Sequence, residues 1–567
     1  MRAGELASSM IFRGGALAMV LYHAIASQYL YFSQWEHQTI HFSFLFLLIF
    51  MSYARKTSNK AVKFLLYACI LVTLVCCAYV YLNTEELEMS QGFPTQAAVI
   101  VGICLMLGTA LCTWLSWGLP LLIVAVVFGS LLGIFKVEGL LMEAGKILGR
   151  RLRGGAGLTA VFSNSLIGMV SGAPVANVAI TGPFVLPYMN RSGYNVDEAG
   201  GILACSATGS QLMPPVMGAA AFMMATFIGQ PYAVVMLAAI LPAVLFYFAV
   251  AMGVQFLSVR KDLKTVQLDV DWGLIRRRVL IFIIPIGLIF AMLLLRYSPA
   301  NTAFWASIVT LVVGFAIKDT RPTWKELIQS LVSGAVTGAK IGISLALIGM
   351  VAQTLISTGL GSKLASLIHM LAGGHLFIAL VVTMIVSLIL GCAVPPAAAY
   401  ALCAIIIPTL TPMGVALLPA HMFCFYFSII AAVTPPVGLA SLAATGISGG
   451  NYAITSVHGF RLSLSGFILP FLIVYNPLFS LDFSNMAWSV CSLLCILAGL
   501  MSLDALLYGA MVRIFRPVDY LLSLLVCAGS FWLTVYGDAL AAPLLLGLTG
   551  AVLALLAAHI IWQRRTA

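Results

Sequence analysis

The stretch ATGSQLMPPVMG, residues 207–218, places two consecutive prolines inside a long apolar run. From Ala199 to Val259 there is no Asp, Glu, Lys or Arg, which is the composition of a segment buried in lipid. A Pro-Pro step removes two N–H donors and frees carbonyl groups one turn earlier. At membrane depth such irregular backbone survives only where protein or a polar cavity surrounds it. The stretch therefore predicts a helix that is broken inside the membrane.

The composition of the whole chain agrees with this expectation. Of its 567 residues, 62% are hydrophobic and 8% are charged, and the mean hydropathy is +1.07. Charged residues make up about a quarter of an ordinary soluble protein. Apolar stretches recur about once per 20 residues, which is the length that a helix needs to cross a bilayer. We therefore expect an all-α polytopic membrane protein.

The positive charges follow the apolar stretches. The formal net charge is +11, and basic residues come in short groups such as RKTSNK (55–60), GRRLR (149–153) and RRR (276–278). The positive-inside rule explains these groups, so no nucleic-acid partner is expected. The first apolar stretch, 10–32, lacks a clear cleavage site, and we interpret it as a retained helix. The twelve cysteines and eight histidines show no metal-ligand spacing, so the chain is not expected to be an enzyme.

The central part of the chain repeats itself. A shift of 221 residues places 214–216 on 435–437, within IIAAVTPPVGLA (429–440). The same shift aligns other prolines and glycines, in the pairs Pro174/Pro395, Pro187/Pro408 and Gly193/Gly414. Upstream the register is expected to slip by two, so that Gly154-Gly155 falls on Gly373-Gly374. We interpret these matches as an internal repeat over about 136–257 and 357–478.

This pattern divides the chain into three expected domains. Residues 1–117 are predicted to form four helices, over about 10–32, 39–54, 62–82 and 95–116. Residues 118–480 hold the internal repeat. Residues 481–567 are predicted to form a C-terminal extension of about three transmembrane helices.

Equivalent helix breaks in two halves of a membrane protein indicate the central site of a transporter, where half-helix N-termini face an anion and freed carbonyls bind a cation. Small and hydroxyl residues flank both breaks, with Ser206, Thr208, Gly209 and Ser210 in the first and Thr434 and Gly438 in the second. The loops SGAP (171–174) and GCAVPP (391–396) each follow a short apolar arm, which predicts two re-entrant hairpins. A Pro-Pro step that merely kinks a helix for packing is the alternative.

The coupling ion is expected to be Na⁺, although H⁺ stays possible. Neutral hydroxyl and carbonyl oxygens are ligands that a hard cation accepts. Residues 364–460 contain no Asp, Glu, Lys or Arg, so this part of the second half offers no carboxylate for a proton. Asp197 and Glu198 either belong to a capped helix start or carry protons. No covalent cofactor is expected.

Four residues are candidates for binding the substrate, namely Asn177, Ser206, Gln211 and Lys340. The amides either bind substrate or satisfy buried backbone groups. Lys340 either meets an anionic substrate or extends toward the membrane surface from the end of an interfacial helix.

Three stretches closely resemble the large membrane subunit of tripartite ATP-independent periplasmic (TRAP) transporters, in particular the fused permeases of the TAXI branch. They are SGAPVANVAITGPFVLPYMNRSGY (171–194), ATGSQLMPPVMGAAAFMMA (207–225) and AAVTPPVGLA (431–440). The resemblance covers about 118–480. Residues 1–117 then look like the small membrane subunit fused in front.

The resemblance implies a multi-pass transporter of the bacterial inner membrane that receives its substrate from a soluble periplasmic binding protein. It also implies an elevator mechanism, in which hairpins and broken helices carry the site past a static scaffold. Carried over by motif, the first cation site would use Ser171, Gly172, Thr208, Gly209 and Pro214. The second would use Gly391, Cys392, Thr434, Pro435 and Gly438.

The sequence therefore predicts an inverted-repeat symporter that imports a small organic anion by means of an ion gradient. A cation- or proton-coupled carboxylate transporter that needs no binding protein is the alternative within transport. An intramembrane enzyme would need clustered acid-base or metal-ligand residues at membrane depth, and none is present in the sequence. A channel would build its filter by oligomerisation, whereas this repeat is internal.

Overall fold

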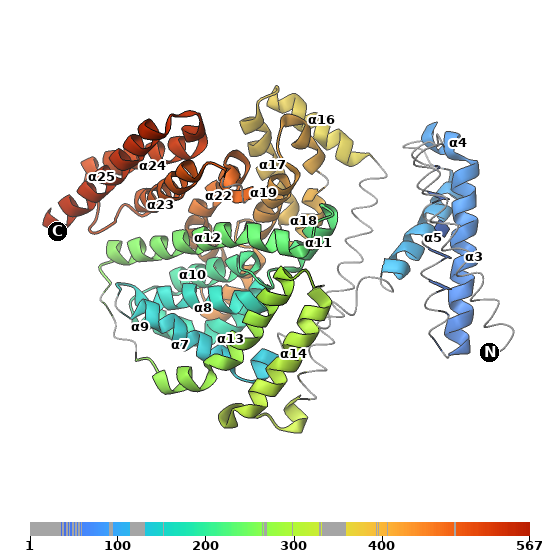
Figure 1. The fold of residues 1–567 in the computed structure, drawn as a ribbon, viewed down its shortest axis with the longest axis horizontal. Helices are drawn as coiled ribbons and strands as arrows, with labels where there is room; N and C mark the ends of the chain where they lie inside the picture. The colour runs from blue at the N-terminus through green and yellow to red at the C-terminus, as the bar shows by residue number, and fades with distance from the viewer. Residues whose placement is uncertain are drawn as a thin grey trace. The chain divides into compact units, whose positions relative to one another are not determined.

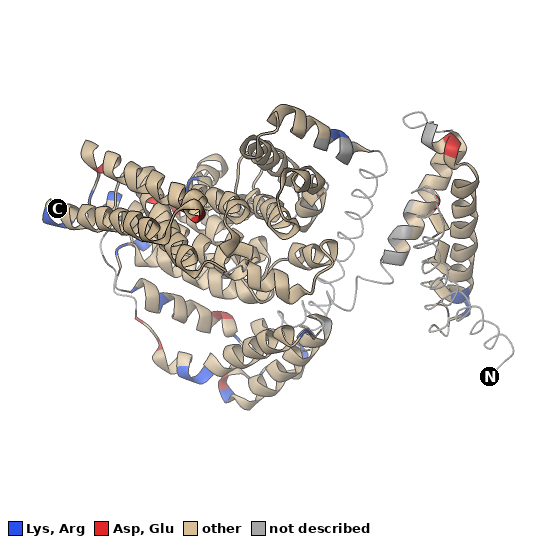
Figure 2. Ribbon diagram, turned by 45° about the horizontal axis from the view of Figure 1, so that its top comes forward, with Lys and Arg blue, Asp and Glu red and all other residues tan. Residues whose placement is uncertain are grey.

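The computed structural model shows helices throughout the described part of the chain (Figure 1). Apart from isolated positions, the residues that the structure describes are 59–89, 95–113, 131–150, 152–263, 269–297, 299–327, 359–392, 396–404, 406–480 and 484–566. Within these ranges there is no β-strand, and seven helices are long and apolar enough to cross a membrane. Charged residues are sparse along the ribbon (Figure 2). The prediction of an all-α polytopic membrane protein is therefore confirmed.

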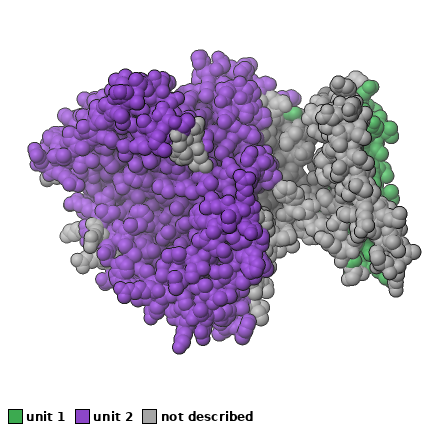
Figure 3. All heavy atoms as spheres, viewed as in Figure 1, with its two compact units in different colours: residues 1–123, 336–361 green, residues 124–335, 362–567 purple. Residues whose placement is uncertain are grey.

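The described residues belong to two compact units, which Figure 3 colours separately. The first unit comprises 1–123 and 336–361, and the second comprises 124–335 and 362–567.

In the first unit, helices α3 (Lys60–Leu82) and α5 (Gln96–Thr113) pack on each other, and the short α4 (Thr84–Met89) lies between them in sequence. Asn59 begins α3 by accepting a hydrogen bond from the Ala61 N–H at 2.9 Å. These helices agree with the expected spans at 62–82 and 95–116. The expected span at 10–32 lies outside the described residues.

The second unit contains the repeat as two series of helices. The first series is α8 (Gly155–Ser171), α9 (Pro174–Arg191), α10 (Val196–Thr208), α11 (Ala219–Phe227) and α12 (Tyr232–Arg260). The second series is α17 (Leu376–Gly391), α18 (Pro396–Ala404), α19 (Leu417–Ile430), α20 (Leu439–Ser448), and α21 (Tyr452–Ser463) continued by α22 (Ile468–Tyr475). In each series two packed helices form a hairpin, and the next helix is separated from its continuation by the Pro-Pro segment.

The register of the repeat differs from the expectation at its upstream end. α8 begins at Gly155 and α17 at Leu376, so these helices keep the shift of 221 residues. The pairing of Gly154-Gly155 with Gly373-Gly374 is therefore wrong. The two glycine pairs have different roles, because Gly155 starts α8 whereas the Gly373 N–H donates to the His369 carbonyl at 3.2 Å and ends α16 (Leu360–Ala372).

A capping box fixes the start of α10, the helix that leads into the first break. The Asn195 side chain accepts a hydrogen bond from the Glu198 N–H at 2.7 Å, and Glu198 accepts one from the Asn195 N–H at 3.0 Å. Asp197 instead joins the two halves, since it accepts hydrogen bonds from the Asn451 N–H at 2.6 Å and the Thr455 hydroxyl at 3.0 Å. In the structure, Glu198 therefore belongs to the cap at the start of α10.

In each series, the helix that follows the Pro-Pro break, here called the continuation helix, packs on helices of the other series. α11, which follows the first break, packs against α18 and α19 of the second series. α20, which follows the second break, packs against α9 and α10 of the first series. This reciprocal packing places each continuation helix against elements of the other half. Pro214 and Pro215 of the first break are buried, whereas Pro436 and Val437 of the second are exposed.

Three further helices complete the second unit at its C-terminal end, as expected. They are α23 (Met486–Tyr508), α24 (Pro517–Tyr536) and α25 (Ala542–Thr566), and all three pack on one another. α23 also packs along α12. The Arg260 guanidinium at the end of α12 donates to the Tyr508 carbonyl at 2.7 Å, which satisfies an unpaired carbonyl at the C-terminus of α23.

Candidate functional site

The two breaks have similar backbone paths. α10 runs into a 3₁₀ turn, η2 (Gly209–Leu212), and the chain then loops back so that the Gly218 N–H donates to the Gln211 carbonyl at 3.1 Å. In the second break the Ala440 N–H donates to the Ala432 carbonyl at 2.9 Å. Both Pro-Pro peptide bonds are cis. Each break is therefore a closed loop rather than a simple kink, which removes the packing-kink alternative.

A tyrosine at the start of the next long helix satisfies carbonyls that each break exposes. The Tyr232 hydroxyl lies 2.8 Å from the carbonyl oxygens of both Pro215 and Val216. The Tyr452 hydroxyl donates to the Pro436 carbonyl at 2.9 Å and accepts from the Gly438 N–H at 2.8 Å. Sequence reasoning missed both tyrosines, although each follows its Pro-Pro step by a similar number of residues.

Tyr232→Phe is expected to lower the free energy of unfolding by about 1–2 kcal/mol, because the Pro215 and Val216 carbonyls lose the one O–H donor that they share. Thermal denaturation of the purified protein measures this change. Tyr536→Phe is the matched control, since Tyr536 is 59% exposed. Equal stability of the two variants would contradict the role assigned to Tyr232.

The tip of the first hairpin rests directly on the first break. α8 ends at Ser171, and Gly172 adopts a left-handed backbone with φ of 53°. A Cβ atom at Gly172 would overlap the Met217 carbonyl oxygen and lie 3.1 Å from the Gly218 Cα. One turn earlier, a Cβ atom at Gly168 would lie 2.7 Å from the Ser210 Cα. Glycine at both positions lets the two backbones touch.

A buried network of polar side chains links this tip to α10. The Ser171 hydroxyl donates to the Asn177 side chain, and the Thr181 hydroxyl lies 3.2 Å from the Asn164 side-chain oxygen. The Asn164 amide donates to the Ser206 hydroxyl at 2.9 Å. Asn164 and Thr181 were not expected from the sequence, because the position of a polar residue along its own helix gives no sign of its partners on other helices.

Three polar atoms around the first break are buried without a hydrogen-bond partner among the described residues. They are the Nδ2 atom of Asn177, the Oγ atom of Ser210 and the Nε2 atom of Gln211. Gln211 lies against Gly218, next to the hairpin tip, because a Cβ atom at Gly218 would be 2.9 Å from Oε1 of Gln211. Buried polar groups are normally paired, so this cluster has unused capacity for a polar ligand.

The two threonines beside the breaks have the same orientation. The Thr208 hydroxyl donates to the Ala204 carbonyl at 2.8 Å, and the Thr434 hydroxyl donates to the Ile430 carbonyl at 2.9 Å. Because each hydroxyl proton is donated to a carbonyl four residues earlier, the lone pairs of both hydroxyl oxygens stay available to a cation.

The second hairpin also contacts its break, but through smaller and less polar groups. A Cβ atom at Gly391 would lie 2.5 Å from the Ala431 Cβ, and Cys392 caps the end of α17. The positions that carry the polar network in the first half are apolar in the second. Asn177, Ser206 and Gln211 correspond to Ala398, Phe427 and Ala432. The backbone is repeated, whereas the polar side chains are not.

The structure thus brings together the expected residues of the first half, since Ser171, Gly172, Asn177, Ser206 and Gln211 belong to one hairpin-break assembly. Gly391, Cys392, Thr434, Pro435 and Gly438 lie at the second hairpin and break. Lys340 lies outside the described residues. Within the described part of the chain, no group of three or more His, Cys, Asp or Glu residues is placed to hold a metal ion.

Comparison with known proteins relates this architecture to a family. The family model "Tripartite ATP-independent periplasmic transporter, DctM component" matches residues 118–483. A relative from Haemophilus influenzae, named "Putative TRAP transporter large permease protein", is 24% identical over 306 residues, which cover 53% of this chain and 71% of the relative. The residues that the family model matches include both hairpins and both breaks.

Proposed function

This chain belongs to the DctM family of tripartite ATP-independent periplasmic transporters, and on that premise we propose that it is a Na⁺-coupled symporter that imports a small organic acid. The family is one of transporters and not of enzymes, and its members are multi-pass permeases of the inner membrane that work with a periplasmic binding protein. The chain would be a fused permease of the TAXI branch, with residues 1–117 in the role of the small subunit.

One observation carries the proposal, namely that each Pro-Pro break is a closed loop in contact with the tip of a helical hairpin. Such paired breaks place helix ends and non-helical backbone next to one another at the centre of a transporter. The two hydroxyls with available lone pairs, from Thr208 and Thr434, support a cation at each break. The ligands are neutral oxygens, which favours Na⁺ over a proton at these two positions.

The unpaired amides of the first half support an anionic substrate. Nδ2 of Asn177 and Nε2 of Gln211 are buried hydrogen-bond donors without partners among the described residues. A carboxylate accepts hydrogen bonds from such N–H groups and has no proton of its own to donate. Because the equivalent positions of the second half are apolar, the carboxylate would bind on the side of the first hairpin. The hairpins and broken helices would then move together as an elevator.

Reconstitution in proteoliposomes tests the function. Uptake of candidate carboxylates is measured with and without an inward Na⁺ gradient, and with and without the binding protein encoded nearest to this chain. We expect uptake only when both are present. Uptake without the binding protein would favour the self-sufficient carboxylate transporter, and uptake driven by a pH gradient alone would overturn the Na⁺ assignment.

Thr208→Val and Thr434→Val are each expected to raise the Na⁺ concentration for half-maximal uptake about tenfold, because one ligand worth roughly 1.4 kcal/mol is lost. Thr226→Val is the control, since the Thr226 hydroxyl makes the same type of hydrogen bond, to the Phe222 carbonyl at 3.1 Å, near the far end of α11. If all three variants keep the wild-type Na⁺ dependence, the assignment of the cation ligands is wrong.

A further inference from the structure

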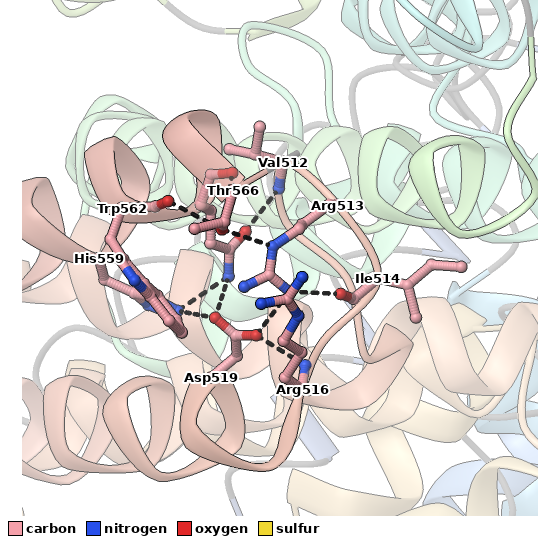
Figure 4. A network of polar contacts seen from close by, with 9 residues as sticks. Val512, Arg513, Ile514, Arg516, Asp519, His559, Trp562 and Thr566 are labelled. Atoms are coloured by element: carbon pink, nitrogen blue, oxygen red, sulfur yellow. Dashed lines mark hydrogen bonds and ion pairs between the residues drawn. The ribbon is translucent and has the colours of Figure 1, made fainter.

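The C-terminal helices contain two carboxylic acids that are completely buried, Asp504 in α23 and Asp519 in α24. Asp519 lies in a dense polar network, drawn in Figure 4. Its carboxyl oxygens contact four groups: Nη1 of Arg513 at 2.9 Å, the N–H of Arg516 at 2.6 Å, Nε2 of His559 at 2.9 Å and Nε2 of Gln563 at 3.0 Å. Asp519 is therefore a paired structural carboxylate.

Asp504 lacks such a network. Its Oδ1 atom accepts a hydrogen bond from the Ser465 hydroxyl, whereas Oδ2 is buried with no partner among the described residues. Within the same residues no Lys, Arg or His forms an ion pair with it. A buried carboxylate without a cation or a full set of donors costs several kcal/mol, and a neutral acid avoids most of that cost.

The ionisable neighbours of Asp504 do not supply a compensating charge. Cys205 of α10, Cys527 of α24 and Tyr508 of its own helix are the groups that interact with it electrostatically. Thiols and phenols are neutral near pH 7. On the α12 side the neighbour is Gly253, where a Cβ atom would lie 3.4 Å from Oδ1.

Charged groups lie at the C-terminal end of α23, about one turn after Asp504. The Arg461 guanidinium stacks over the Tyr508 ring at 4.7 Å and donates to the Leu507 carbonyl. Arg260 binds the Tyr508 carbonyl, and Glu198 pairs with Lys261 at 2.5 Å. Both arginines thus donate hydrogen bonds to α23 carbonyls and form no ion pair with Asp504 among the described residues.

Asp504 is also connected to the transport site. Cys205 precedes Ser206, which accepts the hydrogen bond from Asn164 in the network that reaches the first hairpin. Cys205, which interacts electrostatically with Asp504, and Ser206 are consecutive residues of α10 and so belong to the same turn of that helix. A charge at Asp504 would therefore be felt by the helix that leads into the first break.

We propose that Asp504 is a proton-binding site through which transport responds to protons. The proton sits on the carboxyl group in the buried state, and water accepts it when the carboxyl group becomes accessible to solvent. Ionisable side chains inside membrane segments commonly serve such relays. The coupling to transport rests on the proposed function, whereas the binding of the proton does not.

Infrared spectroscopy of the purified protein tests proton binding without substrate or binding protein. We expect a C=O stretching band of a neutral carboxylic acid that shifts in D₂O, persists at an altered position in Asp504→Glu and is missing in Asp504→Asn. An identical band in wild type and Asp504→Asn would overturn the proton site. If Asp504→Asn does not fold, the comparison of wild type with Asp504→Glu decides, and an unchanged band overturns the proposal.

Uptake at different pH values tests the link to transport. Asp504→Asn imitates the neutral acid and cannot release a proton, so we expect uptake to fall roughly tenfold and to lose its response to pH. Asp262→Asn is the control, because the side chain of Asp262 is 90% exposed. A wild-type pH response in Asp504→Asn would overturn the link. If the wild type takes up no substrate at all, the proposed function fails, while the infrared band still decides the proton site.

Discussion

Gly172→Ala is expected to reduce uptake to background. Gly172 has φ of 53°, a left-handed conformation that costs an alanine about 1–2 kcal/mol. Its new methyl group would also overlap the Met217 carbonyl oxygen in the first break. Because that contact is between two backbones, no side chain can move to relieve it. The hairpin tip would have to separate from the break, which opens the site where we place the cation and the carboxylate.

The control for Gly172→Ala is Gly229→Ala. Gly229 also has a positive φ, of 64°, but an added Cβ atom meets nothing within 4 Å. It therefore carries the conformational cost without the overlap. We expect Gly229→Ala to retain most uptake and to be less destabilised in thermal denaturation than Gly172→Ala. If uptake and stability fall equally in the two variants, the loss is due to backbone strain and not to the contact between the hairpin tip and the break.

Asn177→Leu is expected to lower uptake about 100-fold while the protein still folds and inserts. Asn177 is fully buried, accepts the hydrogen bond from Ser171 and keeps Nδ2 without a partner. Leucine has a similar size, so the packing of α9 is preserved. A hydrogen bond to a charged group is worth up to about 3 kcal/mol, which corresponds to roughly 100-fold in rate or affinity. Initial rates of uptake in proteoliposomes measure the effect.

Two further variants separate the causes of this loss. Asn190→Leu replaces an exposed asparagine at the other end of α9 and is expected to leave uptake unchanged. Asn177→Asp keeps an acceptor for Ser171 but replaces the free donor by a negative charge. If Nδ2 binds the substrate carboxylate, Asn177→Asp loses at least as much uptake as Asn177→Leu. Retained uptake in Asn177→Asp would exclude that contact.

Much of the fold could be predicted because it follows from local properties of the chain. Hydropathy predicted the helices at 62–82 and 95–116 and the three at the C-terminal end. The shift of 221 residues that aligned Pro214 with Pro435 also aligns the starts of α10 and α19. The glycine pairs gave a wrong register upstream, because a glycine that ends one helix and a glycine that starts another look alike in sequence.

The candidate site could be predicted only in part. Its glycines and hydroxyls could be proposed because they lie beside a duplicated Pro-Pro step. Asn164, Tyr232 and Asp504 were not proposed, because their partners lie outside their own helices and the sequence gives no sign of them. Lys340, which was expected to meet the substrate, lies outside the described residues and stays a prediction.

The sequence by itself determined that the protein is a membrane-embedded helical repeat with two broken helices, since composition and proline spacing are properties of the chain alone. Only the tertiary structure decided which atoms around those breaks are left unpaired. Hydrogen-bond satisfaction depends on neighbours that are distant in sequence, as between Asn164 and Ser206 or Ser465 and Asp504. For this reason the two halves share a backbone path, while their polar chemistry differs.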